Sequence, residues 1–589
     1  MISTKITLLQ AVQQEESGFL SDNELDVPDE SDQPFVPNDV FFDQNHNSFE
    51  EAIQEARRRN ISLNSIHAVL NKVMVDLKKT ERNDYVSYSK VRNTWIRIGG
   101  ELVKEHELLG RFEFLGFDGK KSDLICEHNK VKKSVDKITF TDTAAQEYVD
   151  HKLPESGHGR TIAQCLFEVV EKTNSVETIK SISSDSPNSI SGWENGAIRK
   201  FEELLGNEVQ HLHCDLHLNE KILEKVFTAI DGGTKGPDTW GGKLGLQITA
   251  KHGLKRTNMN MEFKPIHGKV EEIKDECGQI LQNNDVKHVH DLSLLVQLGP
   301  KAAGTRLTNS FFKSVGHVHN ARWVTTASNL LILYMQENDP SKELTLLVKF
   351  IVGVYVPALL KIKKTPHCSN GPRHLFEIVQ LSRDLLEEDY PDEFSVVKGC
   401  IEDNSYYLHP EQVLLAMVTD SEEKVREKGI EIIEKFRAQD KYRKENCIGL
   451  MKIRAFKKPE NIDFGAKNYY TMVDIDSFDF DGKYLQYQLV CSPPMLRDYT
   501  IEEIKKRNFS DGFKKVASHS QHIERFVALT SKAAEHAIGY ENRHKWILNH
   551  MASSKKIPTS GAKKDDFIKL VKQKDVEKVK KKLCTGIDQ

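Results

Sequence analysis

Three acidic side chains, Asp118, Asp185 and Glu524, stand in local contexts that suit one catalytic metal site. Asp118 closes an alternating apolar run, 112–119, which predicts a strand that delivers a carboxylate at its tip. Asp185 closes a second such run, 178–185, and Glu524 lies in a stretch with helical periodicity. Hard divalent cations such as Mg²⁺ prefer oxygen ligands, and a pair of them stabilises both the attacking and the leaving oxygen of a phosphoryl transfer. We therefore expect the three carboxylates to converge in the fold.

Two further short motifs could contribute chemistry. Cys214 and His217 form a C-x-x-H sequence, which as half of a zinc site needs a second ligand pair that is not evident nearby. The alternatives are a structural Cys and His at a strand-to-helix junction, or a His217 that lies beside the acids. Arg322 and Trp323 form an Arg-Trp pair, which can hold a phosphate and stack on a base. Most such pairs are structural, and the pair alone does not decide between these roles.

The composition is that of a soluble, intracellular protein with several domains. The chain has 589 residues, 38% of them hydrophobic and 29% charged, which suffices for a sizeable core. Its 9 cysteines are scattered without a C-x-x-C pair, which argues against a disulfide framework and a standard zinc finger. The longest apolar run, 346–360, is interrupted by Lys349 and is predicted to be too short to cross a bilayer. We expect no membrane partner.

Charge is distributed unevenly, although the net charge is only -4. Residues 1–50 hold eleven acidic residues against one Lys, whereas residues 553–583 hold eleven Lys against four acids. This asymmetry predicts an acidic tail and a basic, nucleic-acid-facing tail, and the alternative is two solvated termini.

The periodicity predicts an α/β protein with a mixed sheet and helices packed on it. Strands are expected within 111–140 and at 178–185 and 208–213, helices at 161–172, 193–205 and 216–227, a mainly helical region over 291–443, strand-like pieces at 448–456 and 469–473, and helix over 510–550. Residues 1–48 are predicted to be disordered. The locally basic helical segment 49–109 is either a DNA-binding unit or an ordinary helical pair with a charged face.

The order of these features resembles that of hAT-superfamily DNA transposases. The resemblance rests on a strand with Asp118, a later Asp185, the C-x-x-H of Cys214 and His217, the Arg322–Trp323 pair, and the Ser-Gln-His-Ile-Glu-Arg sequence from Ser520 to Arg525 around Glu524. It spans about residues 110–550 and implies a ribonuclease-H-like core interrupted by a large, mainly α-helical insertion domain. The implied parts are the first core segment 110–230, the insertion 231–508, the last core helix 509–550 and a Lys-rich tail 551–589.

The resemblance also implies an activity and a role for each matched residue. Asp118, Asp185 and Glu524 would bind two Mg²⁺ ions, or Mn²⁺ in vitro, to cut DNA and then transfer a strand. Trp323 would stack on a flipped base, Arg322 and Arg525 would contact DNA, His217 would lie near the scissile phosphate, and Cys214 would be structural. The implied partners are transposon ends and target DNA, the implied assembly is a homo-oligomer, and the implied location is the nucleus.

Two departures from the family pattern leave alternatives open. The family usually begins with a zinc-bearing finger, whereas this chain has no cysteine before Cys126. This favours a domesticated derivative that binds DNA or chromatin partners without cleaving, while retention of all three acids favours a transposase. His519 and Gln521 interrupt the lead-in to Glu524, so Glu411 and Glu535 are the alternatives for the third acid. A third interpretation is a helical scaffold protein in which the three acids have no common function.

Overall fold

The computed structural model describes residues 67, 91–94, 97, 111–125, 132–185, 188–192, 195–236, 239–250, 259–268, 284–313, 322–438, 461–475, 493–517 and 521–552. The chain divides into two compact units, Met1–Ala52 and Ile53–Gln589, and every described residue lies in the second. The expected acidic tail 1–48, the strand-like piece 448–456 and the Lys-rich tail beyond residue 552 lie outside the described residues. The few described residues of the 49–109 segment are helical.

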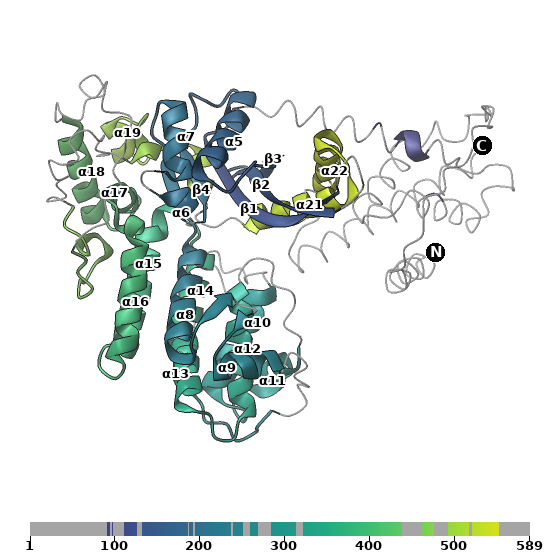
Figure 1. Ribbon diagram of the computed structural model, residues 1–589. Coiled ribbons are helices and arrows are strands. Elements are labelled where there is room, and N and C mark those ends of the chain that lie inside the picture. The colour runs from purple at the N-terminus through teal and green to yellow at the C-terminus, as the bar shows by residue number, and fades with distance from the viewer. Residues whose placement is uncertain are drawn as a thin grey trace, which may run out of the picture. The chain divides into compact units, whose positions relative to one another are not determined.

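A five-stranded mixed sheet organises the described part of the chain, which confirms the α/β class (Figure 1). Its strands are β1 Phe114–Ile125, β2 Lys132–Asp142, β3 Glu147–Lys152, β4 Ser181–Ser184 and β5 Gln210–His213, and two shorter strands, β6 Thr234–Gly236 and β7 Thr239–Trp240, form a separate pair. The order across the sheet is β3-β2-β1-β4-β5. β2 runs antiparallel to both β1 and β3, whereas β4 runs parallel to β1 and β5 parallel to β4.

Helices cover both faces of this sheet (Figure 1). On one face lie α5 Gly159–Lys172, α6 Asn188–Ser191 and α7 Ala197–Leu205, and on the other lie α21 Gln521–His536 and α22 Tyr540–Ala552. Phe117 and Phe140 pack into the hydrophobic cluster with α5 and α7, whereas Tyr148 packs with Phe526 of α21 and Ile547 of α22. Because side chains alternate along a strand, the residues next to Phe117 on β1 face α21.

Phe117 should contribute strongly to stability, because its side chain is 1% exposed at the centre of the sheet. We expect Phe117→Ala to lower the free energy of unfolding by about 3–5 kcal/mol, since it leaves a cavity that close-packed neighbours cannot fill. Urea denaturation would measure the loss. Phe312→Ala is a matched control, because Phe312 is 48% exposed, and it should cost less than about 1 kcal/mol.

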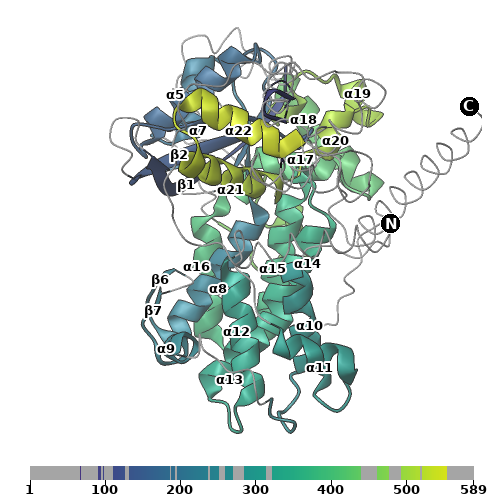
Figure 2. The ribbon, with the colours of Figure 1, turned by 90° about the vertical axis from the view of Figure 1, so that its right-hand side faces the viewer.

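A long helical segment lies between β5 and the last helical pair (Figure 2). Its helices are α8 Asp215–Asp231, α9 Lys243–Ala250, α10 Asn284–Leu298, α11 Gly304–Phe312, α12 Arg322–Gln336, α13 Lys342–Phe350, a π-helical turn Ile351–Tyr355, α14 Val356–Lys364, α15 Gly371–Leu386, α16 Pro391–Asp403, α17 Pro410–Val418, α18 Glu423–Ala438, α19 Ile501–Lys505 and α20 Asp511–Lys515. Short 3-10 turns are Cys368–Asn370, Ser405–Leu408, Tyr469–Thr471 and Pro494–Leu496. The expectation of a mainly helical region is confirmed for these residues.

The most apolar helix is longer than its sequence suggests. α13, the π-helical turn and α14 form one continuous helix over Lys342–Lys364, 23 residues long, which by length and composition could cross a membrane. The expectation that the run 346–360 is too short to do so is therefore wrong. In this structure 78% of the helix's most apolar window is buried inside the protein, where it packs against α8, α10, α12 and α15. A helix that is apolar on all sides is also what the centre of a large helical core requires.

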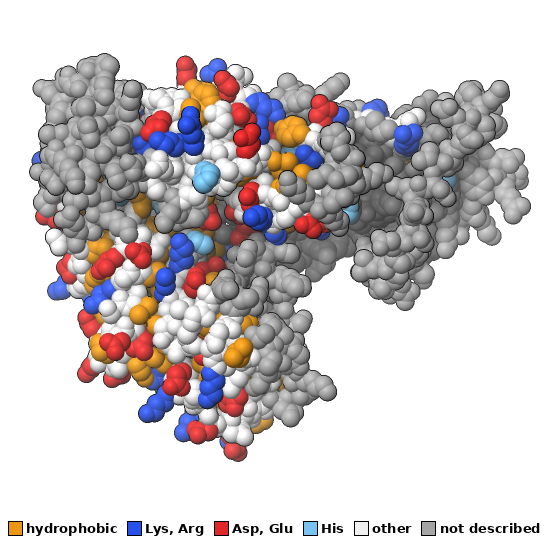
Figure 3. Space-filling view, viewed as in Figure 1, with side chains coloured by type: hydrophobic (Ala, Val, Ile, Leu, Met, Phe, Trp, Pro, Cys, Tyr) orange, Lys and Arg blue, Asp and Glu red, His pale blue; other side chains and the backbone are white. Residues whose placement is uncertain are grey.

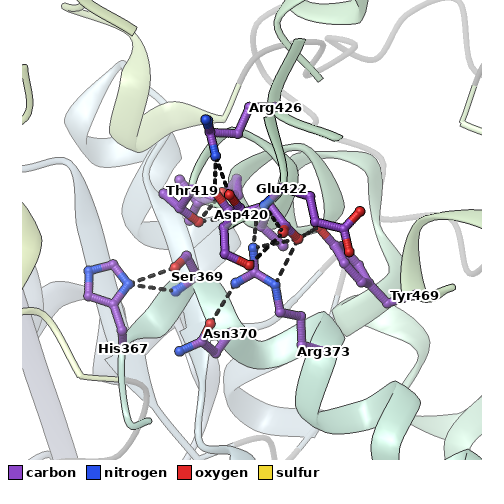
Figure 4. Close-up of polar contacts among 12 residues, drawn as sticks. His367, Ser369, Asn370, Arg373, Thr419, Asp420, Glu422, Arg426 and Tyr469 are labelled. Carbon is purple, nitrogen blue, oxygen red and sulfur yellow. Dashed lines mark hydrogen bonds and ion pairs between the residues drawn. The ribbon is translucent and has the colours of Figure 1, made fainter. Parts of the chain in front are cut away.

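Hydrogen bonds and an ion pair connect separate parts of the helical segment around Asp420 (Figure 4). The Asp420 carboxylate accepts a hydrogen bond of 2.6 Å from the Tyr469 hydroxyl and bonds of 3.1 and 3.2 Å from the Arg373 guanidinium. The Arg373 guanidinium also lies over the Tyr469 ring, 5.2 Å from its centroid. This network joins α15, the junction between α17 and α18, and the segment 461–475.

Several predicted boundaries differ from the structure. The strand expected to end at Asp118 continues to Ile125, and β3 was not predicted. The helix expected over 193–205 begins at Ala197, and the strand-like piece 469–473 is instead the 3-10 turn Tyr469–Thr471. The extension of β1 follows from its pairing with β2, which runs as far as Ile125 opposite Lys132.

Candidate active site

The register of two parallel strands brings Asp118 and Asp185 to neighbouring positions. β1 and β4 are paired with Leu115 opposite Ile182 and Gly116 opposite Ser183. β4 ends at Ser184, and continuing the register by two residues sets Asp185 opposite Asp118. Neighbouring strands lie about 4.8 Å apart, so this continued register predicts that the two carboxylates lie near each other. Asp118 is therefore in the middle of β1 and not at its tip, which corrects our expectation, whereas Asp185 directly follows its strand as predicted.

Helix α21 places Glu524 where the charge of Asp118 acts on it. α21 packs across β1 and β2, and the Thr139 hydroxyl of β2 donates a hydrogen bond of 3.0 Å to the Thr530 hydroxyl of the helix. Gly116 lies where the helix begins: a Cβ added there would meet Ile523 Cδ1 at 3.7 Å and Thr143 Cγ2 at 2.6 Å. The distance to Ile523 is an ordinary van der Waals contact, whereas a larger residue at Gly116 would have to displace the Thr143 side chain. Because Gly116 and Asp118 share a strand face, Glu524, next to Ile523, is brought towards Asp118.

The electrostatics agree with this geometry. Burial raises the pKa of Glu524 from its ordinary value of 4.5 to about 8, with the charge of Lys363 opposing the shift and the charge of Asp118 adding to it. Burial also raises the pKa of Asp185, against the opposing charge of Lys221. Carboxylates that are costly to ionise when buried together are stabilised by a divalent cation, which replaces their lost hydration. Asp118, Asp185 and Glu524 do not form the metal-capable group found among the described residues, so cation binding by these acids stays a prediction.

Two lysines of the helical segment reach this site, and our sequence reasoning missed both. Lys221 lies on α8 and acts on Asp185, whereas Lys363 lies on α14 and acts on Glu524. Lys221 follows His217 by four residues, which places both on one side of α8, so this spacing was a usable signal. Lys363 comes from a helix that is distant in the sequence, and the residues around it do not indicate that it acts on Glu524. Basic groups beside a carboxylate cluster suit a phosphate-bearing substrate.

The C-x-x-H motif lies beside the acids and has a structural part in the fold. Cys214 immediately precedes α8, its N–H donates to the Ser184 carbonyl at 3.2 Å, and its carbonyl accepts a bond of 3.0 Å from the Tyr407 hydroxyl. Burial raises the pKa of the Cys214 thiol well above its ordinary value, and the charges of Asp215 and Glu524 contribute. His217 lies in the first turn of α8. Within the described residues, the one cluster able to hold a metal does not include Cys214 or His217.

The Arg-Trp pair does not join the acids in the structure. Trp323 is 5% exposed and packs in the main core, with its ring 5.9 Å from that of Phe227. Stacking on a base would require the ring to leave the core. Arg322 is the first residue of α12, and its side chain lies outside the described part of the structure. Arg525 follows Glu524 on α21 and is exposed, although partial burial lowers the pKa of its guanidinium.

The alternative third acids occupy other surroundings. Glu411 is fully buried on α17, where it accepts a hydrogen bond from the Tyr406 hydroxyl and lies 3.9 Å from His409 Nδ1. Glu535 is exposed on α21, three turns beyond Glu524. Of the three candidates, Glu524 is the one whose pKa responds to Asp118, so we retain it as the third acid.

A second polar cluster, at the sheet edge, was not predicted. Asp150, His151 and His544 are all buried and could together hold a metal ion. Burial lowers the pKa of His151 to about 3. Burial works in the opposite direction on Asp150, but the Tyr540 hydrogen bond and the Lys172 charge outweigh it and hold the pKa of that carboxyl below its ordinary value. At neutral pH this cluster thus contains a neutral imidazole and an ionised carboxylate.

The surface drawn in Figure 3 carries both signs of charge. Among the side chains coloured there, Lys and Arg are interspersed with Asp and Glu over both the sheet and the helical segment. The coloured side chains of this face therefore offer a nucleic acid scattered basic groups and not a continuous basic tract. The predicted basic tail 553–583 falls outside the described residues.

Comparison with known proteins adds no assignment to this geometry. No protein-family model matches the sequence, and a search of curated proteins found no significant similarity. The chemistry of the site is therefore argued from its own residues.

Proposed function

We propose that this protein is a divalent-metal-dependent enzyme that cleaves DNA strands and transfers them, as hAT-superfamily transposases do. Two observations support the proposal: the charge of Asp118 on β1 acts on Glu524 of α21, and the register of β1 and β4, continued by two residues, sets Asp185 opposite Asp118. Burial raises the pKa values of Glu524 and Asp185, and the charge of Asp118 adds to the shift at Glu524; carboxyls with such perturbed pKa values often belong to functional sites.

The donor set fits Mg²⁺ or Mn²⁺. All three groups are hard oxygen donors, and the raised pKa values of Glu524 and Asp185 indicate a need for positive charge that Lys221 and Lys363 meet only in part. When bound, a pair of divalent ions supplies activation of the attacking hydroxyl and stabilisation of charge at phosphorus. The carboxylates would hold and space the ions, and Glu524 would release its proton when they bind.

The surrounding residues have roles that follow from their positions. Arg525 is exposed beside Glu524 and would contact a phosphate of the DNA backbone. Lys363 and Lys221 would contribute positive charge from the helical segment, and His217 would face the substrate from the same side of α8 as Lys221. Cys214 would anchor that helix to the end of β4 through its backbone.

We further infer that the sheet is a ribonuclease-H-like core with an inserted helical domain. Three features support this: one strand, β2, runs against the other four, the first acid lies on the central strand β1, and the second follows its parallel neighbour β4. The long helical segment separates β5 from α21, and α21 then returns to β1. DNA in the nucleus would be the substrate, and a homo-oligomer would be the working assembly.

Plasmid nicking by the purified full chain tests this function. We expect nicking in Mg²⁺ or Mn²⁺ that chelation with EDTA stops and that Asp118→Asn abolishes. Asp123→Asn is the matched control, because Asp123 lies on the same strand and is exposed, and it should cut as the wild type does.

Two results would overturn the assignment. Nicking that survives Asp118→Asn would place the activity elsewhere. DNA binding without nicking, equal in the wild type and in Asp118→Asn, would favour the alternative of a transposase-derived protein that binds DNA or chromatin partners without cleaving. The DNA used should include substrates with pre-nicked and single-stranded ends, because a transposase deprived of its own terminal sequences cuts intact plasmid weakly.

A further inference from the structure

The acid–histidine cluster at the sheet edge has the composition and spacing of a metal site. Asp150 and His151 come from β3, the edge strand, and His544 comes from α22, which covers it. Their exposed fractions are 1%, 1% and 8%, and one ligand atom from each lies within 4.8 Å of the other two. The ligands of a four-coordinate ion with bonds of about 2.0–2.2 Å are roughly 3.5 Å apart, so small side-chain adjustments would close this cluster on a metal.

A β-bulge creates the cluster. Thr141 is opposite Tyr148 and Phe140 is opposite Asp150, so Val149 has no partner on β2. The extra residue lets Tyr148 and His151, three positions apart, lie on the face that α21 and α22 cover. Bulges of this kind re-aim side chains, and they are often found near functional sites.

The surrounding hydrogen bonds leave one imidazole nitrogen available. His151 Nδ1 lies 2.7 Å from the Tyr148 hydroxyl, which also lies 3.2 Å from His544 Nδ1. His151 Nε2 is buried and has no hydrogen-bond partner within the described part of the chain. Metal-binding histidines usually engage a neighbour through the ring nitrogen that does not bind the metal, and the Tyr148 contact serves this purpose. An orphaned, buried imidazole nitrogen otherwise costs stability.

The carboxylate is held in a comparable way. Lys172 contacts Asp150 Oδ2 at 3.2 Å, and the Tyr540 hydroxyl donates to Asp150 Oδ1 and accepts from Lys172 at 3.1 Å. The Asp150 Oδ1 atom lies 3.9 Å from His544 Nδ1. Lys172, Tyr540 and the His151 N–H, which donates to Asp150 Oδ1 at 2.7 Å, therefore fix the orientation of the carboxylate, with Oδ1 towards His544.

We propose that Asp150, His151 and His544 bind a borderline divalent transition metal of the zinc class, which fastens α22 to the edge of the sheet. Two imidazoles and one carboxylate suit such an ion, whereas Mg²⁺ and Ca²⁺ favour sites built from oxygen alone. The site is separate from the three acids, and its test does not depend on DNA cleavage. Because α22 packs on α21, the metal would also stabilise the position of the helix that carries Glu524.

Zinc binding by the chelator-treated full chain tests the proposal. We expect one Zn²⁺ per chain, measured by competition with a chromophoric chelator, and a rise in Tm on its addition. His544→Gln and His151→Gln should each weaken Zn²⁺ affinity by about 100-fold or more. Co²⁺ added in place of Zn²⁺ should give a visible ligand-field band in the wild type that both variants lose.

The controls separate this site from others. His536→Gln removes an exposed histidine from the neighbouring helix α21 and should leave zinc binding unchanged. Asp185→Asn disables the proposed catalytic acids and should also leave it unchanged, so failure of the proposed nuclease function and failure of the zinc site are distinguishable. A wild type that binds no Zn²⁺ tightly, or His544→Gln and His151→Gln variants that fold and bind it as the wild type does, would overturn the proposal.

Discussion

Replacing Glu524 with Gln is expected to lower metal-dependent DNA cleavage by roughly 10³-fold, because several kcal/mol of charge stabilisation depend on this third carboxylate. Gln keeps the size of the side chain and its place on α21, but it is a neutral and weaker oxygen donor. The charge of Asp118 contributes to the raised pKa of Glu524, so the substitution removes a group that interacts with Asp118 and that we propose as its partner in the active site. Single-turnover nicking of end-labelled DNA would measure the rate.

Glu535→Gln is the matched control for this prediction. It makes the same chemical change on the same helix at an exposed position, and it should leave the cleavage rate within about twofold of the wild type. DNA affinity measured in Ca²⁺ should be similar in all three proteins, which separates loss of chemistry from loss of binding. Equal rates for Glu524→Gln and wild type would remove α21 from the active site, and with it the assignment of an interrupted core.

Local features of this site could be predicted from the sequence, whereas the pairing of its strands could not. The strand that precedes Asp185 ends where its apolar alternation ends, and this could be read directly. Asp118 was expected at a strand tip, because the alternation weakens after it. The structure continues β1 to Ile125, since β2 pairs with it along that whole length, whereas β4 pairs only as far as Gly116. Which of the two neighbouring strands ends first depends on the tertiary fold and not on the local sequence.

Side-chain environments were harder to predict than elements. Trp323 follows an Arg and could equally stack on a base or fill a core, and packing against Phe227 settled it as a core residue in this fold. The edge cluster depended on an unpredicted strand, on a bulge at Val149, and on His544 from near the far end of the core. No local spacing relates His151 to His544, so only the folded arrangement could reveal them.

In the absence of divalent metal, the stability of the protein should fall as pH rises through the neutral range, and Glu524→Gln should relieve much of this fall. The pKa of Glu524 is 4.5 ordinarily and about 8 in the folded chain. Between these values the folded chain keeps a proton on Glu524 that the unfolded chain has lost, so rising pH favours unfolding by up to about 1.4 kcal/mol per pH unit. The stabilisation is complete below pH 4.5 and is lost as the pH passes 8.

Urea denaturation of the wild type and Glu524→Gln, in EDTA, would measure this effect from pH 5 to pH 9. Other buried groups titrate nearby, notably His151 with its pKa lowered to about 3, so the difference between the two proteins is the informative quantity. We expect Glu524→Gln to become progressively more stable than the wild type as pH rises, and Glu535→Gln to follow the wild type throughout. Added Mg²⁺ should reverse the order above pH 8, because only the wild type then has the ionised carboxylate that the cation stabilises. A difference that does not change with pH would mean that Glu524 ionises as an ordinary exposed acid, and the site would then have no need of a metal.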